Sequence, residues 1–170
     1  LDAHWAFYLA GDEVVAAWPV GVGKDSSATR VGTFIVGEKS KEPMWFPQGR
    51  KPVPYGDPEN PLGTRWIAWN DAEGNTTRLG FHGTNEPETI GQAASSGCIR
   101  MRNEDVVDLY NRVKPGTKGR SHSTLALSSR SGTPTASVLV ARCLASMKEP
   151  PAIRRRPSTG SPSTETSTPL

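Results

Sequence analysis

The feature that most constrains the fold is the alternation of short extended segments with glycine-rich turns over the first hundred residues. Trp5, Phe7 and Leu9 alternate with small or polar residues, which is typical of a half-buried strand. A β-branched and aromatic run follows at 33 to 36, and residues 78 to 82 are extended again. Short strands separated by turns predict a mainly β, antiparallel protein of the sandwich or barrel-like kind.

Two segments depart from this β pattern. From 43 to 61 prolines and glycines are so dense that no regular element can run through, because proline lacks an N–H donor and restricts the residue before it. We expect a long ordered loop or a lid there. Residues 103 to 113 combine acidic residues in a first turn with one apolar face, which predicts a single helix with Asn103 as its N-cap.

The composition changes near residue 118. Residues 1 to 118 are predicted to form one compact domain, and the sequence opens inside this domain, so that its N-terminal edge is missing. Residues 119 to 170 are rich in Ser, Thr, Pro and Arg, which predicts a largely disordered tail. Only the segment from 138 to 147 is apolar enough for a short helix or strand. No stretch reaches the roughly 20 apolar residues of a membrane-spanning helix.

Charge and cysteine content narrow the function classes. The net charge of +3 is mild and the five tryptophans are scattered, so we expect no nucleic-acid partner. Cys98 and Cys143 are too few for a disulfide framework. A zinc site from these two cysteines with His82 and His122 is a weak alternative, since no pair has metal-ligand spacing. We expect neither a metal nor a cofactor.

Two segments carry groups suited to nucleophilic catalysis. Residues 80 to 85 contain His82 between glycines, and residues 95 to 101 contain Cys98 directly after a glycine. A thiol becomes a strong nucleophile when an imidazole takes its proton or a neighbouring positive charge lowers its pKa. Each segment alone also has an ordinary explanation, namely a packed structural cysteine and a surface or core histidine.

Taken together, the two segments resemble the signature of the L,D-transpeptidase catalytic domain, in which a histidine motif precedes a Ser-x-Gly-Cys-x-Arg motif on a neighbouring strand. The similarity covers roughly residues 5 to 117. It extends outward through residues 20 to 23, 32 to 34, 60 to 66 and 101 to 106.

The resemblance implies a role for each residue of the two motifs. Cys98 is expected to be the nucleophile and His82 its base. The carbonyl of Gly83, or of a residue just before Cys98, is expected to orient the imidazole. The amides around Gly97 are expected to form an oxyanion hole, with Ser96 as a further orienting group.

Two more residues are candidates for substrate contact. Arg100 is expected either to bind a substrate carboxylate or to form an ion pair that pins its strand, and these two roles are left open. Asn85 is likewise expected to bind substrate or to anchor the site.

The implied activity is that of a peptidoglycan L,D-transpeptidase in the periplasmic or extracytoplasmic cell envelope, although no signal-peptide pattern opens the sequence. The implied partners are peptidoglycan stem peptides and an envelope lipoprotein, with carbapenems as inhibitors. One alternative keeps the fold but uses water as acceptor, making the protein an L,D-carboxypeptidase or amidase. Another is a catalytically inert cell-wall-binding module with Cys98 merely packed.

The sequence departs from the family pattern at two places. Many members carry histidine where this chain has Ser96. After Thr117, the apolar strand of the family is replaced by Lys118-Gly119-Arg120-Ser121-His122. We expect a sheet short of one strand, as a frameshifted or divergent gene end would produce.

Overall fold

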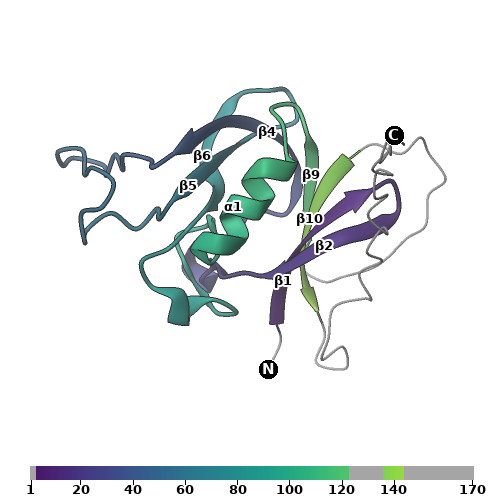
Figure 1. Ribbon diagram of the computed structural model, residues 1–170, viewed down its shortest axis with the longest axis horizontal. Coiled ribbons are helices and arrows are strands. Elements are labelled where there is room, and N and C mark those ends of the chain that lie inside the picture. Colours follow the sequence, from purple (N-terminus) through teal and green to yellow (C-terminus); the bar gives the residue numbers. More distant parts are fainter. Residues whose placement is uncertain (1–2, 123–135, 144–170) are drawn as a thin grey trace, which may run out of the picture.

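The computed structural model describes residues 3 to 122 and 136 to 143, and strands predominate in it (Figure 1). The strands are β1 (Ala3–Ala10), β2 (Glu13–Pro19), β3 (Val22–Gly23), β4 (Gly32–Lys41), β5 (Arg65–Asn70), β6 (Thr76–His82), β7 (Ala93–Ser95), β8 (Ile99–Arg100), β9 (Lys118–His122) and β10 (Ala136–Cys143). The helical elements are α1 (Asn103–Arg112) and the single 3-10 turns η1 (Asp25–Ser27) and η2 (Pro87–Thr89). The predicted mainly β fold with one α-helix after the cysteine motif is confirmed.

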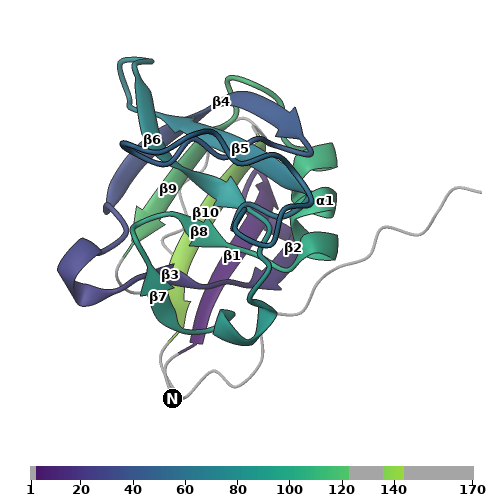
Figure 2. The same ribbon diagram turned by 90° about the vertical axis from the view of Figure 1, so that its left-hand side faces the viewer.

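Eight of the strands form one curled sheet in the order β2-β1-β10-β9-β4-β5-β6-β8, and β3 and β7 form a small second sheet. The large sheet bends into a half-barrel, and α1 lies against it (Figure 2). Most neighbouring pairs are antiparallel, as expected, but β9 with β10 and β6 with β8 are parallel. β8 is the last strand of the order, and on its outer side Arg100 forms an isolated antiparallel bridge with Gly21.

Aromatic side chains fill the interior of the half-barrel. The rings of Phe34 and Trp69 stack with centroids 4.0 Å apart, and Phe81 meets both edge-on. Val106 and Leu109 of α1 are fully buried against this core. The packing holds β6, which carries the histidine motif, between the core and the loops outside the sheet. No helix among the described residues is long and apolar enough to cross a membrane.

The helix begins where it was predicted, but its cap differs. The N-cap is Arg102, and its side chain makes no capping hydrogen bond. Asn103 does not cap the helix, because its side chain is hydrogen-bonded to the loops beside the helix. At the other end, Lys39 Nζ donates hydrogen bonds to the carbonyls of Tyr110 and Val113, at 2.6 and 2.7 Å. These bonds satisfy carbonyls that the helix itself leaves without a partner.

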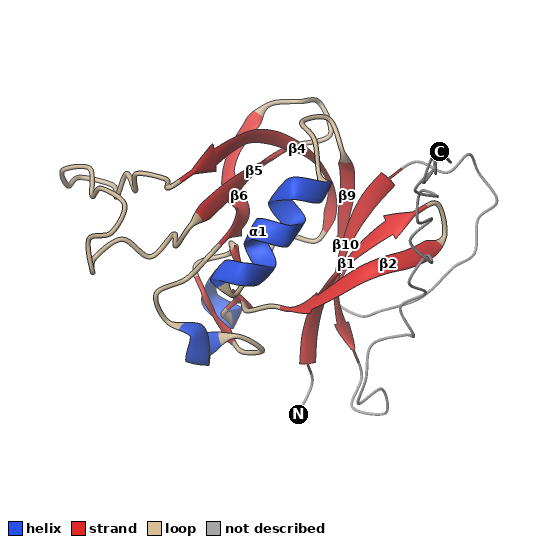
Figure 3. Ribbon diagram, viewed as in Figure 1, coloured by secondary structure: helices blue, strands red, loops and turns tan. Residues whose placement is uncertain are grey.

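The connection between β4 and β5 is the predicted irregular loop, and it projects from the end of the sheet (Figure 3). Its base is tied together by Asn60, which is 5% exposed and donates to the carbonyls of Pro43, Val53 and Pro54. Trp45 and Val53 form an isolated antiparallel bridge farther out. The loop is therefore ordered by its own hydrogen bonds rather than by a strand or helix.

Two expectations are wrong. The fold does not end at residue 118, and the strand expected to be missing from the sheet is present. β9 pairs antiparallel with β4, and β10 inserts between β9 and β1. β9 needs no apolar pattern, because its backbone supplies the ladder hydrogen bonds and its inward positions are the small residues Gly119 and Ser121. The segment predicted from 138 onward is a strand, Ala136–Cys143. Of the tail predicted to be largely disordered, 119 to 170, the parts that the structure describes form these two strands, and residues 123 to 135 and 144 to 170 lie outside the described residues.

Adding a methyl group at Gly119 should destabilise the domain. A Cβ at this position would overlap the ring of Phe34, which cannot move freely because it stacks on Trp69. Gly119→Ala should therefore lower the free energy of unfolding by about 1–3 kcal/mol, as overpacked cores do. Chemical denaturation measures this, with Arg120→Ala, an exposed position on the same strand, as control. Equal stability of the two variants would show that β9 does not pack on Phe34.

Candidate active site

Parallel pairing of β6 with β8 brings the histidine and cysteine motifs together. His82 pairs with Arg100 and Phe81 with Ile99. Directly paired residues of neighbouring strands point to the same face of the sheet, so His82 and Arg100 share one face, and Cys98 is the residue just before β8. The Cys98 thiol donates to the Arg78 carbonyl of β6 with a sulfur-to-oxygen distance of 3.6 Å. The two motifs thus lie on neighbouring strands, as predicted.

His82 is held in one orientation. It is 5% exposed, and its Nδ1 lies 2.6 Å from the Gly83 carbonyl oxygen. Since a carbonyl only accepts hydrogen bonds, Nδ1 carries the proton and Nε2 keeps a free lone pair. The Trp66 ring stacks beside the imidazole with centroids 5.9 Å apart. The orienting carbonyl is therefore that of Gly83, one of the two sources that the sequence left open.

Burial lowers the pKa of His82 from 6.5 to about 4. The hydrogen bond to Gly83 opposes this shift, the positive charge of Arg100 adds to it, and the Pro61 carbonyl opposes it again. A pKa this low means that the imidazole is neutral at pH 7. A neutral imidazole with a free Nε2 is able to accept a proton.

The pKa of the Cys98 thiol is raised, mainly because the group is buried. A backbone hydrogen bond from Gly80 and the charge of Arg100 act in the opposite direction without outweighing burial. The nearby positive charge thus does act to lower the pKa of Cys98, as expected, but the net shift is upward. At pH 7 the resting pair is a neutral thiol and a neutral imidazole, so the thiolate has to be produced by proton transfer during attack.

The turn before Cys98 is shaped by Ser95, a residue of the cysteine motif for which the sequence predicted no separate role. Ser95 is 2% exposed; its hydroxyl donates to the Cys98 carbonyl at 2.6 Å and accepts from the Gly97 amide at 3.1 Å. Gly97 has φ +110°, a conformation that side chains disfavour. Ser96, the residue expected to orient the site, is exposed. The signal for Ser95 was its place at the start of the Ser-x-Gly-Cys turn.

Ser95→Ala should loosen this turn. Without the hydroxyl, the Gly97 amide and the Cys98 carbonyl each lose a partner in a buried setting, which destabilises a protein by roughly 1–3 kcal/mol. Ser96→Ala is the matched control and should change the stability by less than about 0.5 kcal/mol, because its side chain is exposed. Urea denaturation of both variants checks this. A loss for Ser96→Ala that equals or exceeds that for Ser95→Ala would contradict it.

Arg100 forms the strand-pinning ion pair that the sequence left as one of two possibilities. Its Nη1 lies 2.7 Å from Glu86 Oε2 and donates to the Thr89 hydroxyl at 3.3 Å. The Arg100 side chain is 17% exposed, so part of it still faces solvent beside Cys98. Asn85 donates to the Pro58 carbonyl at 2.9 Å and thereby ties the loop after His82 to the projecting loop. Both residues anchor loops around the site.

A shallow hollow of about 600 Å³ adjoins the histidine motif. It lies between the loop after His82 and the start of α1, and is lined by Thr84, Asn85, Pro87, Arg102, Asn103 and Glu104. Its position places polar backbone and side-chain groups next to the base.

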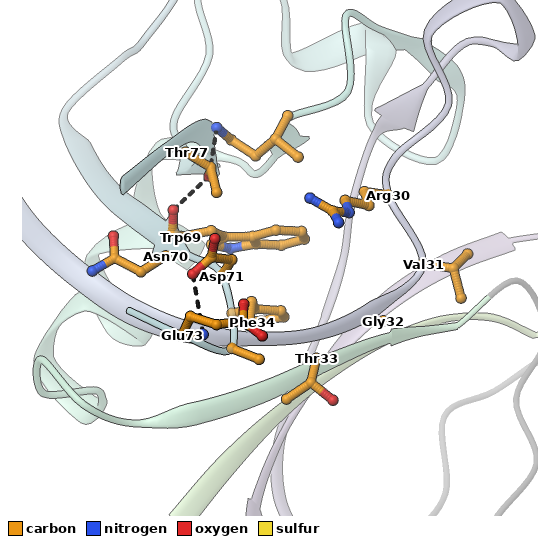
Figure 4. Close-up of a pocket in the computed structure, with 12 residues that line it drawn as sticks. Arg30, Val31, Gly32, Thr33, Phe34, Trp69, Asn70, Asp71, Glu73 and Thr77 are labelled. Atoms are coloured by element: carbon orange, nitrogen blue, oxygen red, sulfur yellow. Dashed lines mark hydrogen bonds between the residues drawn. The ribbon is translucent and has the colours of Figure 1, made fainter. Parts of the chain in front are cut away.

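A second cavity, of about 210 Å³, lies at the other end of β5 and β6 (Figure 4). Phe34, Trp69 and Leu79 form its apolar wall, and Arg30 and Asp71 contribute charges. The indole Nε1 of Trp69 is buried there without a hydrogen-bond partner. Neither His82 nor Cys98 lines this cavity, and neither lines the hollow beside α1.

Comparison with known proteins gives a consistent assignment. Residues 1–120 match the family described as the L,D-transpeptidase catalytic domain. The chain is 40% identical over 111 residues to YqjB of Bacillus subtilis, covering 65% of this chain and 61% of that protein. It is 36% identical over 107 residues to YkuD of Bacillus licheniformis, covering 63% and 53%. Both relatives are named L,D-transpeptidases on a provisional basis.

A solved structure, that of the Ldtfm–avibactam carbamoyl enzyme, has the same fold. It superposes with a TM-score of 0.51 at 21% identity, over 66% of this chain and 42% of that one. The chain spans less than two thirds of the length of either relative above. The family match nevertheless includes both motifs and all but the last strand and a half of the sheet. The chain belongs to the L,D-transpeptidase catalytic domain family.

Proposed function

We propose that this chain is a peptidoglycan L,D-transpeptidase that acts through a thioester on Cys98, with His82 as general base. The observation that supports this most is the orientation of His82. Its Nδ1 proton is donated to the Gly83 carbonyl, so that the lone pair of the neutral ring is at Nε2, and β6 pairs with β8, the strand that directly follows Cys98. An inert packed thiol would need no oriented base beside it.

The first half-reaction follows from these groups. As the Cys98 sulfur attacks the carbonyl carbon before the terminal D-alanine of a stem peptide, His82 Nε2 takes the thiol proton. The Cys98 amide is the donor assigned to the oxyanion that forms, because the Gly97 amide already donates to the Ser95 hydroxyl. When the carbon–nitrogen bond breaks, His82 returns the proton to the departing amine, and a thioester is left. The imidazolium of His82 and the oxyanion therefore exist only during the reaction, and both residues of the resting pair are neutral again or acylated when it ends.

The second half-reaction determines the product. An amine attacks the thioester carbon, His82 takes the proton of the amine, and the proton passes to sulfur as the thiol leaves. A diaminopimelate amine would give a cross-link, a lipoprotein lysine would give an anchored lipoprotein, and water would make the enzyme a carboxypeptidase. The projecting loop, tied to the site by Asn85 and Pro58, is placed to limit the access of water.

The substrate and the cellular location follow from the same assignment. We assign the stem peptide to the hollow beside α1, where Asn85 and Arg102 line the wall and can meet its carboxylates. We expect carbapenems to acylate Cys98; the solved structure of similar fold is that of an avibactam carbamoyl enzyme, in which an inhibitor of a different class is attached covalently. Peptidoglycan lies in the cell envelope, so the proposed location is periplasmic or extracytoplasmic.

The proposal is tested by incubating the protein with a tetrapeptide stem, with and without a second stem that carries a free diaminopimelate amine. Mass spectrometry of the products should show release of D-alanine and a cross-linked dimer when the acceptor is present. A tripeptide alone, in equal yield with and without acceptor, would assign the carboxypeptidase reaction instead. No loss of D-alanine under any condition would favour the inert wall-binding alternative.

The acylation rate should have an acid limb near pH 4 and not near the ordinary histidine value of 6.5. Burial lowers the pKa of His82, so the neutral base persists as pH falls and disappears only when pH passes through about 4. At high pH the raised pKa of Cys98 keeps the thiol protonated beyond the usual thiol range. Stopped-flow acylation by a carbapenem, measured in pH jumps short enough to avoid unfolding, checks this. An acid limb at 6 to 7 would contradict the neutral-pair mechanism.

A further inference from the structure

We infer that Asn103, the first residue of α1, is a positioning residue whose side-chain amide fixes the His82–Gly83–Thr84 segment and through it the orientation of the base. This inference rests on the proposed function. It assigns a role to a residue that would otherwise count only as the start of a helix.

The amide of Asn103 uses both of its ends. Its Nδ2 donates to the Thr84 carbonyl at 3.0 Å, and its Oδ1 accepts from the Thr64 amide at 3.0 Å. Exchanging nitrogen and oxygen would place donor against donor and acceptor against acceptor, so the network allows one orientation of this side chain. Thr64 lies 39 residues and Thr84 lies 19 residues from Asn103 in the sequence. One side chain therefore joins three separate segments.

Two glycines make room for this amide. A Cβ added at Gly63 or at Gly83 would overlap Asn103 Oδ1, so both positions must lack a side chain for the amide to sit where it does. Gly63 also has φ +61°, which favours glycine on its own account. The Gly83 backbone thus lies directly against Asn103 on one side, while its carbonyl holds His82 on the other.

The connection to the base runs through consecutive peptide groups. The Gly83 carbonyl that accepts from His82 Nδ1 belongs to the peptide that leads into Thr84, whose own carbonyl is held by Asn103. The other anchors of this segment are backbone bonds, from the Gly83 amide to Arg65 and from the Met101 amide to the His82 carbonyl. Asn103 is the side-chain anchor of the segment, and removing it should let the Gly83 carbonyl rotate away from the imidazole.

The test compares Asn103→Ala and Asn103→Asp in the full chain, with Asn111→Ala, an exposed position on the same helix, as control. Aspartate keeps the acceptor for Thr64 but loses the donor to Thr84. Long-range proton–nitrogen correlation of ¹⁵N-histidine protein at pH 7 reports which ring nitrogen of His82 is protonated, with His82→Gln used to assign the signal. Thermal unfolding midpoints and steady-state constants with the tetrapeptide are measured on the same samples.

Wild type and Asn111→Ala should show His82 protonated at Nδ1 alone, whereas both Asn103 variants should show a mixture of tautomers. In the Asn103 variants kcat should fall by on the order of 10- to 100-fold, because the base is misplaced. Asn103 also lines the hollow assigned to the stem peptide, so the tautomer of His82 and not KM is the criterion. If Asn103→Ala fails to fold, Asn103→Asp decides the question alone. A lowered unfolding midpoint with an unchanged His82 tautomer would overturn the inference. A wild-type protein without activity would refute the proposed function while the tautomer comparison still stands.

Discussion

Cys98→Ala should abolish acyl transfer and acyl-enzyme formation with stem peptides and carbapenems. The thiol is the atom that bonds to the substrate in the proposed mechanism, and removal of a nucleophile typically lowers kcat by about 10⁴-fold or more. Cys98→Ser should be nearly as damaging, since a hydroxyl is a much poorer nucleophile than a thiol in a site that lacks a strong activating charge. Release of D-alanine measures the loss directly.

The same variant should fold normally. Cys98 is only half-buried, and the hydrogen bond that its thiol donates, to the Arg78 carbonyl, is a weak sulfur contact of 3.6 Å. Cys143→Ala is the matched control because it removes the other cysteine of the chain, and we expect it, like deletion of residues 150 to 170, to leave the rate unchanged. Residual exchange of D-alanine by the Cys98→Ala protein would show that the nucleophile is misassigned.

His82→Ala should slow acylation by a factor of about 10²–10⁴, the usual contribution of a general base, and should leave substrate binding largely intact. The effect is expected to be large here because the raised pKa of Cys98 leaves little thiolate at pH 7 without a base. Single-turnover acylation by a carbapenem separates the rate from the binding step.

Two controls sharpen the His82 experiment. Free imidazole should restore part of the rate in His82→Ala, because the ring occupies a buried space beside Trp66 that a small base can refill. His122→Ala, which changes an exposed histidine on β9, should have no effect. A His82→Ala rate within threefold of wild type would contradict the assignment of the base.

The sequence was sufficient for the elements with strong local signals. The loop from 43 to 61 follows from proline and glycine chemistry, and the helix from Asn103 onward follows from its acidic first turn and apolar face. β9 could not be predicted in this way. It packs glycine and serine inward, and its place depends on pairing with β4, about 90 residues earlier, which no local pattern records.

The sequence was sufficient to predict the reactive residues of the site but not the residues that position them. The paired motifs identify Cys98 and His82, whereas Ser95 and Asn103 act through hydrogen bonds whose partners are set by the tertiary fold. The protonation states are hidden from the sequence for the same reason. A basic neighbour such as Arg100 suggests a lowered thiol pKa, and only the burial seen in the structure shows that desolvation outweighs it.

The assignment of Cys98 as the nucleophile is tested by finding which residue carries the acyl group. The protein is mixed with a carbapenem or a tetrapeptide stem, quenched in acid, digested, and mapped by mass spectrometry. The proposed mechanism predicts a single adduct, on the peptide that carries Cys98. The adduct should also form in the Cys143→Ala protein, form more slowly in His82→Ala and be absent from Cys98→Ala. An adduct on any other residue, or turnover of the stem peptide by Cys98→Ala, would contradict it.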